Sequence, residues 1–286
     1  MRLNRREAIT LALAALPCAG CAAAQKLGPA TAGESAQATV PGSQSPSSEP
    51  ASPSISSSAS PSSVALPLAG KVVGIDPGHN GGNFADPGFI NQLIWNGREQ
   101  ETCDTTGTQT DSGYTEALFN FHVASHLRDD LVAAGATVVM TRKTNNGVGP
   151  CVNHRAEIIN AARADVAIDI HADGGPSWGR GFTVLEPVAD GPNDKVIRDS
   201  IRFGASVRDA LLKYSSMPQS DYYGQDGVVF RNDLAGLNLT TVPKVLVECG
   251  NMPNSTDAAL LASRSFQREI AGAFTTAIIS FLTGQS

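Results

Sequence analysis

Alternating strand and helix patterns between Lys71 and Leu282 constrain the fold of this chain more than any other feature. Short apolar segments typical of buried strands are followed repeatedly by longer segments with the 3.6-residue period of a helix. Such alternation is typical of layered α/β proteins, in which helices cover a sheet of largely parallel strands. We therefore expect an α/β fold with helices on both faces of the sheet.

The expected elements follow one another in a simple order. Strands are predicted at Lys71–Ile75, Ala136–Thr141, Val166–Ile170, Phe182–Glu186, Val228–Arg231 and Lys244–Glu248. Helices are predicted at Thr115–Ala134, Asn153–Arg163 and Lys195–Tyr214, and two more within Ser255–Leu282. The segment Asn83–Gly113 has little periodicity, so we expect a long loop that is either functional or mobile.

The first 68 residues lack the apolar periodicity that a core needs. Residues 1–24 combine basic residues with the apolar run Ala8–Leu16, as a secretory signal peptide does. Cys18 and Cys21 lie in an imperfect lipoprotein cleavage box, so lipidation and simple cleavage both stay open. Residues 25–68, rich in Ser, Pro and Ala, predict a disordered linker.

Residues 69–286 are therefore expected to form one folded domain, exported to the periplasm or cell wall. The formal net charge of the whole chain is −6, which disfavours a nucleic-acid partner. We expect a monomer that touches the membrane only through a possible N-terminal lipid anchor.

Export also changes what the cysteines can do, because an oxidising compartment permits disulfides. Cys103, Cys151 and Cys249 remain after the signal peptide. Cys103 and Cys151 both lie in loops rich in glycine and threonine, whereas Cys249 follows the apolar run Val245–Val247. The preferred prediction is a Cys103–Cys151 disulfide and a buried, unpaired Cys249.

Four polar residues fall at the ends of predicted elements. His79 follows the first strand within the glycine-rich sequence IDPGHNGG, His171 follows the strand Val166–Ile170, and Glu248 ends the last strand. The carboxyl ends of parallel strands share one edge of a sheet, where ligands bind in open α/β folds. Glu116 opens the helix after the first of these strands, so all four are expected to converge.

Glu116 also lies on the apolar face of its helix, together with the residues at 119, 123, 127 and 131. A buried carboxylate there must be paired, hydrogen-bonded or bound to a metal. A partly exposed acid in the first helical turn, near the positive end of the helix dipole, is the alternative.

Zinc-dependent hydrolysis fits this set of side chains. Two imidazoles and one carboxylate hold Zn²⁺ while a second carboxylate takes the proton of the attacking water. The residues thus predict one zinc ion held by His79, Glu116 and His171, with Glu248 as the catalytic general base.

Three blocks of sequence make a family resemblance specific: IDPGHNGG at 75–82, HRAEIINAARADVAIDIHAD at 154–173 and VPKVLVECGNMPNSTDAALL at 242–261. In order and spacing they resemble the signature blocks of zinc-dependent N-acetylmuramoyl-L-alanine amidases, the amidase type 3 family of peptidoglycan hydrolases. The resemblance implies a mixed, mostly parallel sheet of about six strands flanked by helices. It also implies zinc ligands at His79, Glu116 and His171, a catalytic Glu248, and cleavage of the amide between N-acetylmuramic acid and L-alanine.

The segment between His79 and Glu116 is longer than in many family members, which leaves Glu116 the least certain ligand. Glu99 and Glu101 lie within that segment but are poorer candidates, because a mobile loop positions a ligand less well than a helix does. The segment 83–113 could cover the site or grip glycan, and we hypothesise that it gates access. The sequence assigns no substrate-binding residue.

Two alternative functions remain at this point. The chain could be a zinc peptidase that cuts stem-peptide cross-links, or a wall-binding or regulatory module that kept the fold without catalysis. Glu248 disfavours the second alternative, because a binding module needs no base beside its metal.

Overall fold

The computed structural model describes residues 65–284. The predicted signal peptide, the cysteines Cys18 and Cys21, and all but the last residues of the predicted linker lie outside this range. Leu68 is fully buried, and its N–H donates to the carbonyl of Ala134 at 2.9 Å. None of the helices in the described residues is long and apolar enough to cross a membrane.

A six-stranded sheet lies at the centre of the described residues. It contains β1 (Val72–Pro77), β4 (Thr137–Met140), β5 (Val166–Asp173), β6 (Thr183–Pro187), β7 (Val228–Arg231) and β8 (Lys244–Asn251). The strand order is β4-β1-β5-β8-β6-β7, and every neighbouring pair is parallel except β6 with β8. The predicted mixed, mostly parallel sheet is therefore confirmed.

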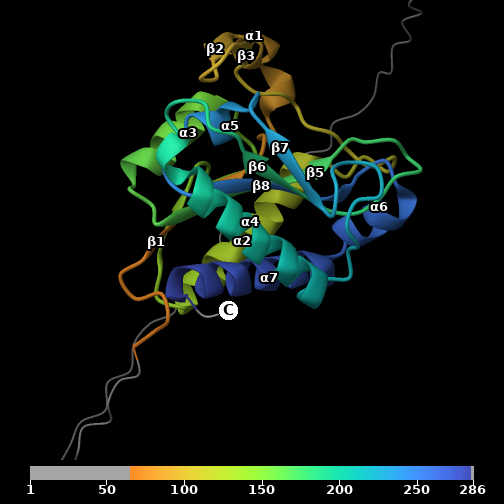
Figure 1. Ribbon diagram of the computed structural model, residues 1–286. Coiled ribbons are helices and arrows are strands. Elements are labelled where there is room, and N and C mark those ends of the chain that lie inside the picture. Colours follow the sequence, from red (N-terminus) through yellow and green to blue (C-terminus); the bar gives the residue numbers. More distant parts are fainter. Residues whose placement is uncertain (1–64, 285–286) are drawn as a thin grey trace, which may run out of the picture. The chain divides into compact units, whose positions relative to one another are not determined.

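Helices cover both faces of this sheet (Figure 1). One face carries α2 (Glu116–Ala133), α4 (Ile197–Tyr214) and α7 (Arg264–Thr283). The other carries α3 (Val152–Ala161) and α5 (Ala235–Asn238), a one-turn helix that the sequence pattern did not reveal. The short helix α6 (Ser255–Leu261) follows β8 directly.

Side-chain alternation along the strands divides the core between the two faces. On β5, Val166, Ile168 and Ile170 are fully buried in the large cluster formed with α2, α4 and α7. Ala167 points the other way and packs against Ile159 of α3. His171 belongs to the same alternating set as Ala167, so its position on the strand follows from the burial of its neighbours.

The segment between Asn83 and Gly113 contains more structure than the predicted loop. It forms a 3₁₀ turn (Asn83–Ala85), α1 (Pro87–Ile90) and an antiparallel hairpin of β2 (Leu93–Trp95) and β3 (Gln100–Thr102). Each strand of the hairpin has only three residues, too few to produce a detectable period. The expectation of an irregular loop was therefore wrong for this part of the chain.

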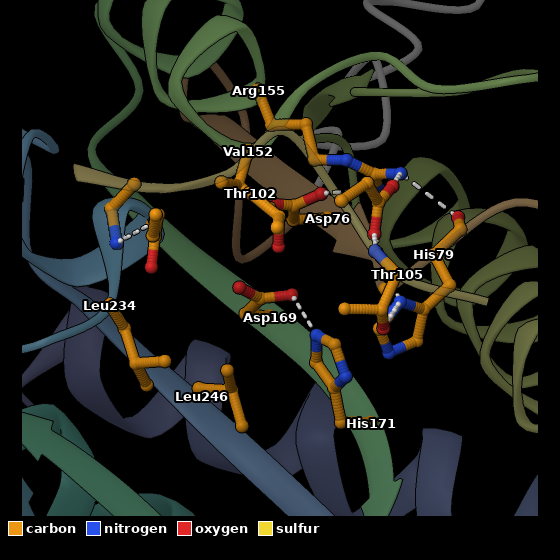
Figure 2. A pocket seen from close by; sticks show the side chains of 15 residues that line it. Asp76, His79, Thr102, Thr105, Val152, Arg155, Asp169, His171, Leu234 and Leu246 are labelled. Carbon is orange, nitrogen blue, oxygen red and sulfur yellow. Dashed lines mark hydrogen bonds and ion pairs between the residues drawn. The ribbon is translucent and has the colours of Figure 1, made fainter. Parts of the chain in front are cut away.

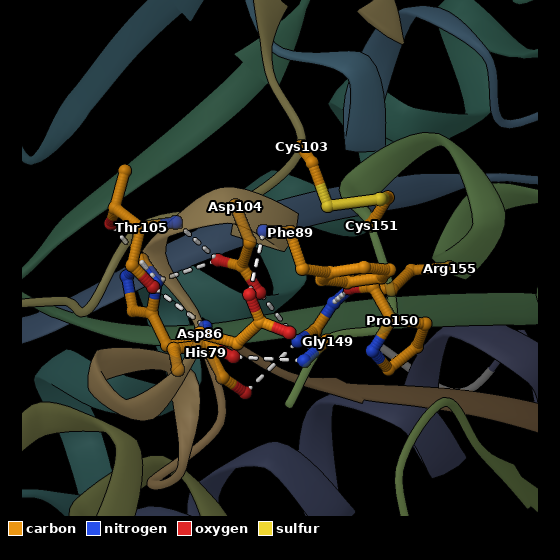
Figure 3. The surroundings of a disulfide bond; sticks show 11 residues. His79, Asp86, Phe89, Cys103, Asp104, Thr105, Gly149, Pro150, Cys151 and Arg155 are labelled. Atoms are coloured by element: carbon orange, nitrogen blue, oxygen red, sulfur yellow. Dashed lines mark hydrogen bonds and ion pairs between the residues drawn. A yellow bond between two sulfur atoms is a disulfide. The ribbon is translucent and has the colours of Figure 1, made fainter. Parts of the chain in front are cut away.

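A disulfide joins this segment to the start of α3 (Figure 3). It links Cys103 to Cys151, as predicted, and the backbone N–H of Val152 donates to the carbonyl of Cys103 at 2.8 Å. Cys249 is buried and unpaired. The end of the hairpin is thus fixed to the fold by one covalent link and one hydrogen bond.

Replacing Cys103 and Cys151 together by serine should lower the free energy of unfolding by about 2–4 kcal/mol, because the unfolded chain regains the freedom of a large loop. In a domain of this size we expect the melting temperature, followed by circular dichroism, to fall by about 5–15 °C. Reducing agent should lower the wild-type value to that of the double variant and leave the variant unchanged. Equal melting temperatures would show that the link adds nothing.

Glu186 on β6 is a buried carboxylate on the α4 side of the sheet. Its Oε1 atom lies so close to Gly204 of α4 that a Cβ atom at position 204 would clash with it. Burial raises its pKa to about 7, although the charge of Arg208 lowers it. Because the folded state holds the proton more tightly than the unfolded chain does, the stability contributed by the neutral carboxyl is lost as pH rises from about 4.5 to about 7.

The variant Glu186→Gln should therefore match the wild type near pH 4.5 and exceed its free energy of unfolding by about 1–2 kcal/mol at pH 8. This free-energy difference is smaller than the full pKa shift would give, because Glu186 borders a cleft that admits water. Urea unfolding at both pH values measures the difference, and Glu99→Gln at an exposed position is the control. A gain of equal size at both pH values would contradict the assignment to ionisation.

Candidate metal centre

His79, Glu116 and His171 meet at the carboxyl edge of the sheet. Their potential ligand atoms all lie within 4.8 Å of one another. The Oε1 atom of Glu116 is 3.3 Å from Nε2 of His79 and 2.8 Å from Nδ1 of His171. The two imidazole rings are 4.9 Å apart and nearly perpendicular. The structure thus brings together all three residues that the sequence proposed as metal ligands, including Glu116 at the end of the long insertion.

Two glycines near the site allow the candidate ligand side chains to lie close to the backbone. A Cβ atom on Gly78 would lie 2.2 Å from the His171 ring, and one on Gly107 would lie 2.7 Å from both Glu116 and His79. His79 itself has a φ of +56°, a left-handed conformation that non-glycine residues seldom adopt. This backbone turn directs the imidazole back toward the end of β5.

The glycines Gly81 and Gly82, just after His79, allow a different close approach. A Cβ atom on either one would lie within 2.4 Å of the backbone carbonyl of Asn145 or Gly147. These glycines therefore allow the loop after β4 to pack against the histidine-bearing turn.

Glu116 is 4 % exposed, which decides between the two interpretations of its place on the helix. Its carboxylate accepts hydrogen bonds from the backbone N–H of Thr108 at 2.9 Å and of Ala172 at 3.3 Å. Asn120, one turn further along α2, adds a side-chain N–H at 3.4 Å. Glu116 is thus held rigidly as a buried carboxylate.

Each histidine turns its second ring nitrogen toward another carboxylate. Nδ1 of His79 hydrogen-bonds Oδ1 of Asp104 at 2.9 Å, next to the disulfide in Figure 3. Nε2 of His171 lies 3.3 Å from Oδ1 of Asp169, as Figure 2 shows. Metal-binding histidines commonly have such a carboxylate behind them, because it fixes the ring and makes the metal-facing nitrogen a better donor.

Buried ion pairs connect these two supporting carboxylates underneath the site. Arg155 of α3 donates to Asp104 at 3.0 Å and to Asp76 of β1 at 3.1 Å. Lys244 of β8 donates to Asp76 at 2.9 Å and lies 3.4 Å from Asp169. Arg155 thus joins two buried carboxylates as a structural ion-pair partner.

The electrostatic balance of the cluster favours a cation. Burial opposes the charged imidazoles, but the neighbouring carboxylates outweigh it, so the pKa of His79 rises to about 9 and that of His171 rises well above its usual value. Burial likewise opposes ionisation of Glu116, yet the charges and hydrogen bonds of the two histidines hold its pKa well below the usual range. Such a site stabilises positive charge, whether carried by protons or by a metal cation that displaces them.

Glu248 lies beside the three ligand candidates. It is the residue of β8 that pairs in register with His171 of β5, so the two side chains leave the sheet on the same face. Its Oε2 atom is buried without a hydrogen-bond partner among the described residues. Burial raises the pKa of Glu248 to about 8 against the opposing charge of His171, and the negative charges of Glu116 and Asp173 add to the rise.

A cavity of about 170 Å³ opens next to the two histidines on the α3 and α5 side (Figure 2). Glu101 lines this cavity, but it accepts the N–H of Ala235 at 3.1 Å and is not part of the three-residue cluster. Glu99 is exposed on the hairpin. The structure therefore places Glu116, and neither of the two insertion glutamates, with the histidines.

Sequence reasoning missed the supporting carboxylates. Asp169 shares its strand face with His171, which was a usable signal, since alternation already placed the two on the same side. Asp104 gave no comparable signal, because it lies 25 residues from His79 and outside any predicted element. Only the tertiary structure brings it to the imidazole, where the Cys103–Cys151 disulfide and the ion pair with Arg155 hold it beside α3.

Comparison with known proteins agrees with this geometry. Residues 73–280 match the family described as N-acetylmuramoyl-L-alanine amidase. An N-acetylmuramoyl-L-alanine amidase of Mycobacterium tuberculosis is 41% identical over 243 residues, which cover 82% of this chain and 95% of that protein. The chain belongs to the N-acetylmuramoyl-L-alanine amidase family.

Solved structures extend the likeness of this amidase-family chain to its fold. The crystal structure of the amidase Ami1 from Mycobacterium smegmatis superposes with a TM-score of 0.72 at 40% identity, covering 76% of this chain and 99% of that one. The apo form of Ami1 from Mycobacterium abscessus gives a TM-score of 0.71 at 40% identity, covering 75% of this chain and all of that one, 100%. The likeness thus includes the whole of both solved domains.

Replacing Asp104 by asparagine should weaken metal binding by about 10–100-fold, because the neutral amide no longer orients and polarises the imidazole of His79. Zinc affinity measured by competition with a chelating dye tests this directly. Asp129→Asn, at an exposed position of α2, is the matched control and should bind as the wild type does. Unchanged affinity in Asp104→Asn would remove Asp104 from the support of the site.

Proposed function

We propose that this chain hydrolyses the amide bond between N-acetylmuramic acid and L-alanine in peptidoglycan. The observation that carries the proposal is the pairing of His171 with Glu248 across β5 and β8. This pairing places a carboxylate oxygen, which has no hydrogen-bond partner among the described residues, beside a cluster of two histidines and one carboxylate. Membership of the amidase family supplies the identity of the bond.

We infer that one zinc ion is held by His79, Glu116 and His171. Two imidazoles and a carboxylate are the ligands of many hydrolytic zinc sites, and carboxylates behind both rings fit that role. Carboxylates also outnumber cations here: Asp76, Asp104, Glu116, Asp169 and Glu248 face Arg142, Arg155 and Lys244. Zinc supplies a lowered pKa for water and polarisation of the substrate carbonyl.

Glu248 is proposed as the general base. Its carboxylate accepts the proton of the attacking water, and the same group then delivers that proton to the leaving amine of L-alanine. The apolar strand neighbours Val247 and Cys249 are fully buried on the opposite face, which holds the backbone of Glu248 in place. A base fixed on a strand keeps the short reach that proton transfer requires.

The proposed substrate, peptidoglycan, also implies where the chain acts. Peptidoglycan lies outside the cytoplasmic membrane, so we propose that the chain works in the periplasm or cell wall, as the signal-like start predicts. A lipid anchor at Cys18 or Cys21, a monomeric state and gating by residues 83–113 stay predictions.

The variant Glu248→Gln should keep zinc and lose about 10²–10⁴-fold in kcat, since the amide cannot accept the proton. His171→Ala should lose zinc as well as activity. Metal content by atomic emission and digestion of purified muropeptides, with mass spectrometry of the products, test both variants. Free stem peptides released from glycan support the amidase, whereas cuts within the peptide would establish the alternative of a zinc peptidase. Zinc binding with no cleavage of either bond would favour the binding module.

A further inference from the structure

Trp178 presents an indole ring to solvent in the loop that follows β5. Its side chain is 73% exposed, the second most exposed of the large apolar residues in the described chain after Phe84. A single exposed apolar residue is normal on a protein surface, so exposure alone points to no ligand, but an aromatic ring held in a fixed position can bind one. The question is whether this tryptophan is held in place or merely left outside.

Two asparagine side chains hold the loop around Trp178. Asn251, at the end of β8, donates to the carbonyls of Pro176 and Gly179 at 2.8 and 2.7 Å. Asn254, the N-cap of α6, donates to the carbonyl of Ser177 at 3.0 Å. These three side-chain hydrogen bonds to carbonyls leave the backbone under Trp178 little freedom.

The other end of the loop is fixed in the same way. The fully buried carboxylate of Asp257 accepts from the side chain of Arg180 at 3.0 Å and from the N–H of Gly181 at 2.7 Å.

Residues 175–179 also satisfy the pattern G-x-S-x-G, but they connect β5 to β6 and not a strand to a helix, so they do not form the nucleophile turn of a serine hydrolase.

Tyr222 links the tryptophan to the metal centre. Its ring meets the indole edge-on with centroids 6.5 Å apart. A Cβ atom on Gly175 or Gly179 would lie within 2.5 Å of the tyrosine ring, so only glycine at these two positions leaves room for the ring. The tyrosine hydroxyl donates to Asp173 at 2.7 Å, and Asp173 follows His171 by two residues on β5.

We propose that Trp178, supported by Tyr222, is a binding platform for a sugar ring of the glycan. The inference rests on the proposed function, because the family's substrate joins an N-acetylated sugar acid to L-alanine at the scissile amide. A pyranose ring has a flat C–H face that can cover the indole, whereas the methyl group of alanine cannot. The platform would thus recognise the sugar side of the substrate and leave the peptide side to other residues.

Fluorescence tests the platform without catalysis. The chain has 2 tryptophans, so the variant Trp95→Phe leaves Trp178 as the single indole emitter. Titration with soluble, peptide-free glycan strands should shift or quench the emission, and free stem peptide should not. A response to the peptide alone, or to neither probe, would overturn the proposal.

Kinetics on polymeric peptidoglycan provide the second test. Trp178→Ala should raise KM about tenfold with little change in kcat, and Trp178→Phe should recover part of the loss. Tyr214→Ala, at a 46% exposed aromatic on α4, is the control and should behave as the wild type. An unchanged KM in Trp178→Ala would reject the platform.

The two proposals fail separately. Wild-type protein that cleaves the amide but shows no glycan response rejects the platform alone. Wild-type protein that cleaves nothing rejects the proposed function, while the glycan titration still decides whether Trp178 binds sugar.

Discussion

The chain of buried ion pairs beneath the candidate metal centre is the constraint on which the rest of the site depends. Arg155 bridges Asp104 and Asp76, and Lys244 bridges Asp76 and Asp169. Removal of one member would break one or two of these buried ion pairs, although each remaining side chain keeps another charged partner. The chain begins behind one histidine and ends behind the other, so the same interactions that satisfy buried charges also fix both imidazole rings.

This network combines parts of the sequence that lie far apart. Asp76 comes from β1, Asp169 from β5 and Lys244 from β8, three neighbouring parallel strands. Arg155 comes from α3 and Asp104 from the hairpin segment, and the Cys103–Cys151 disulfide connects those two elements next to both residues. The covalent link is therefore placed where it limits motion between Asp104 and Arg155, and through them the orientation of His79.

Two different surfaces flank the carboxyl edge of the sheet. Parallel register puts His171 beside Glu248, and the close approach allowed by Gly78 brings His79 against them. On one side a cavity lined by the hairpin and α5 adjoins the histidines. On the other, the loop after β5 presents Trp178 over Tyr222. A candidate metal centre set between a cavity and an exposed aromatic surface suits a substrate with two chemically different halves.

The sequence by itself determined the α/β class, the six strands and the disulfide pairing, and it predicted that His79, Glu116, His171 and Glu248 converge at one edge. It could do so because strand and helix periods are local, and because residues at the carboxyl ends of parallel strands must share an edge. The family resemblance added the bond that is cut. The sequence pattern did not reveal the short hairpin or the one-turn helix α5.

Only the tertiary structure decided that Glu116 is buried against both histidines, and that Asp104 and Asp169 support them. The reason is physical: a contact such as Asp104 to His79 depends on how the segment after a hairpin of three-residue strands is joined to α3, and no local period records that connection. The same holds for Trp178, whose sequence neighbours show only a loop, while its fixed exposure comes from asparagine and aspartate side chains some 75 residues further along the chain.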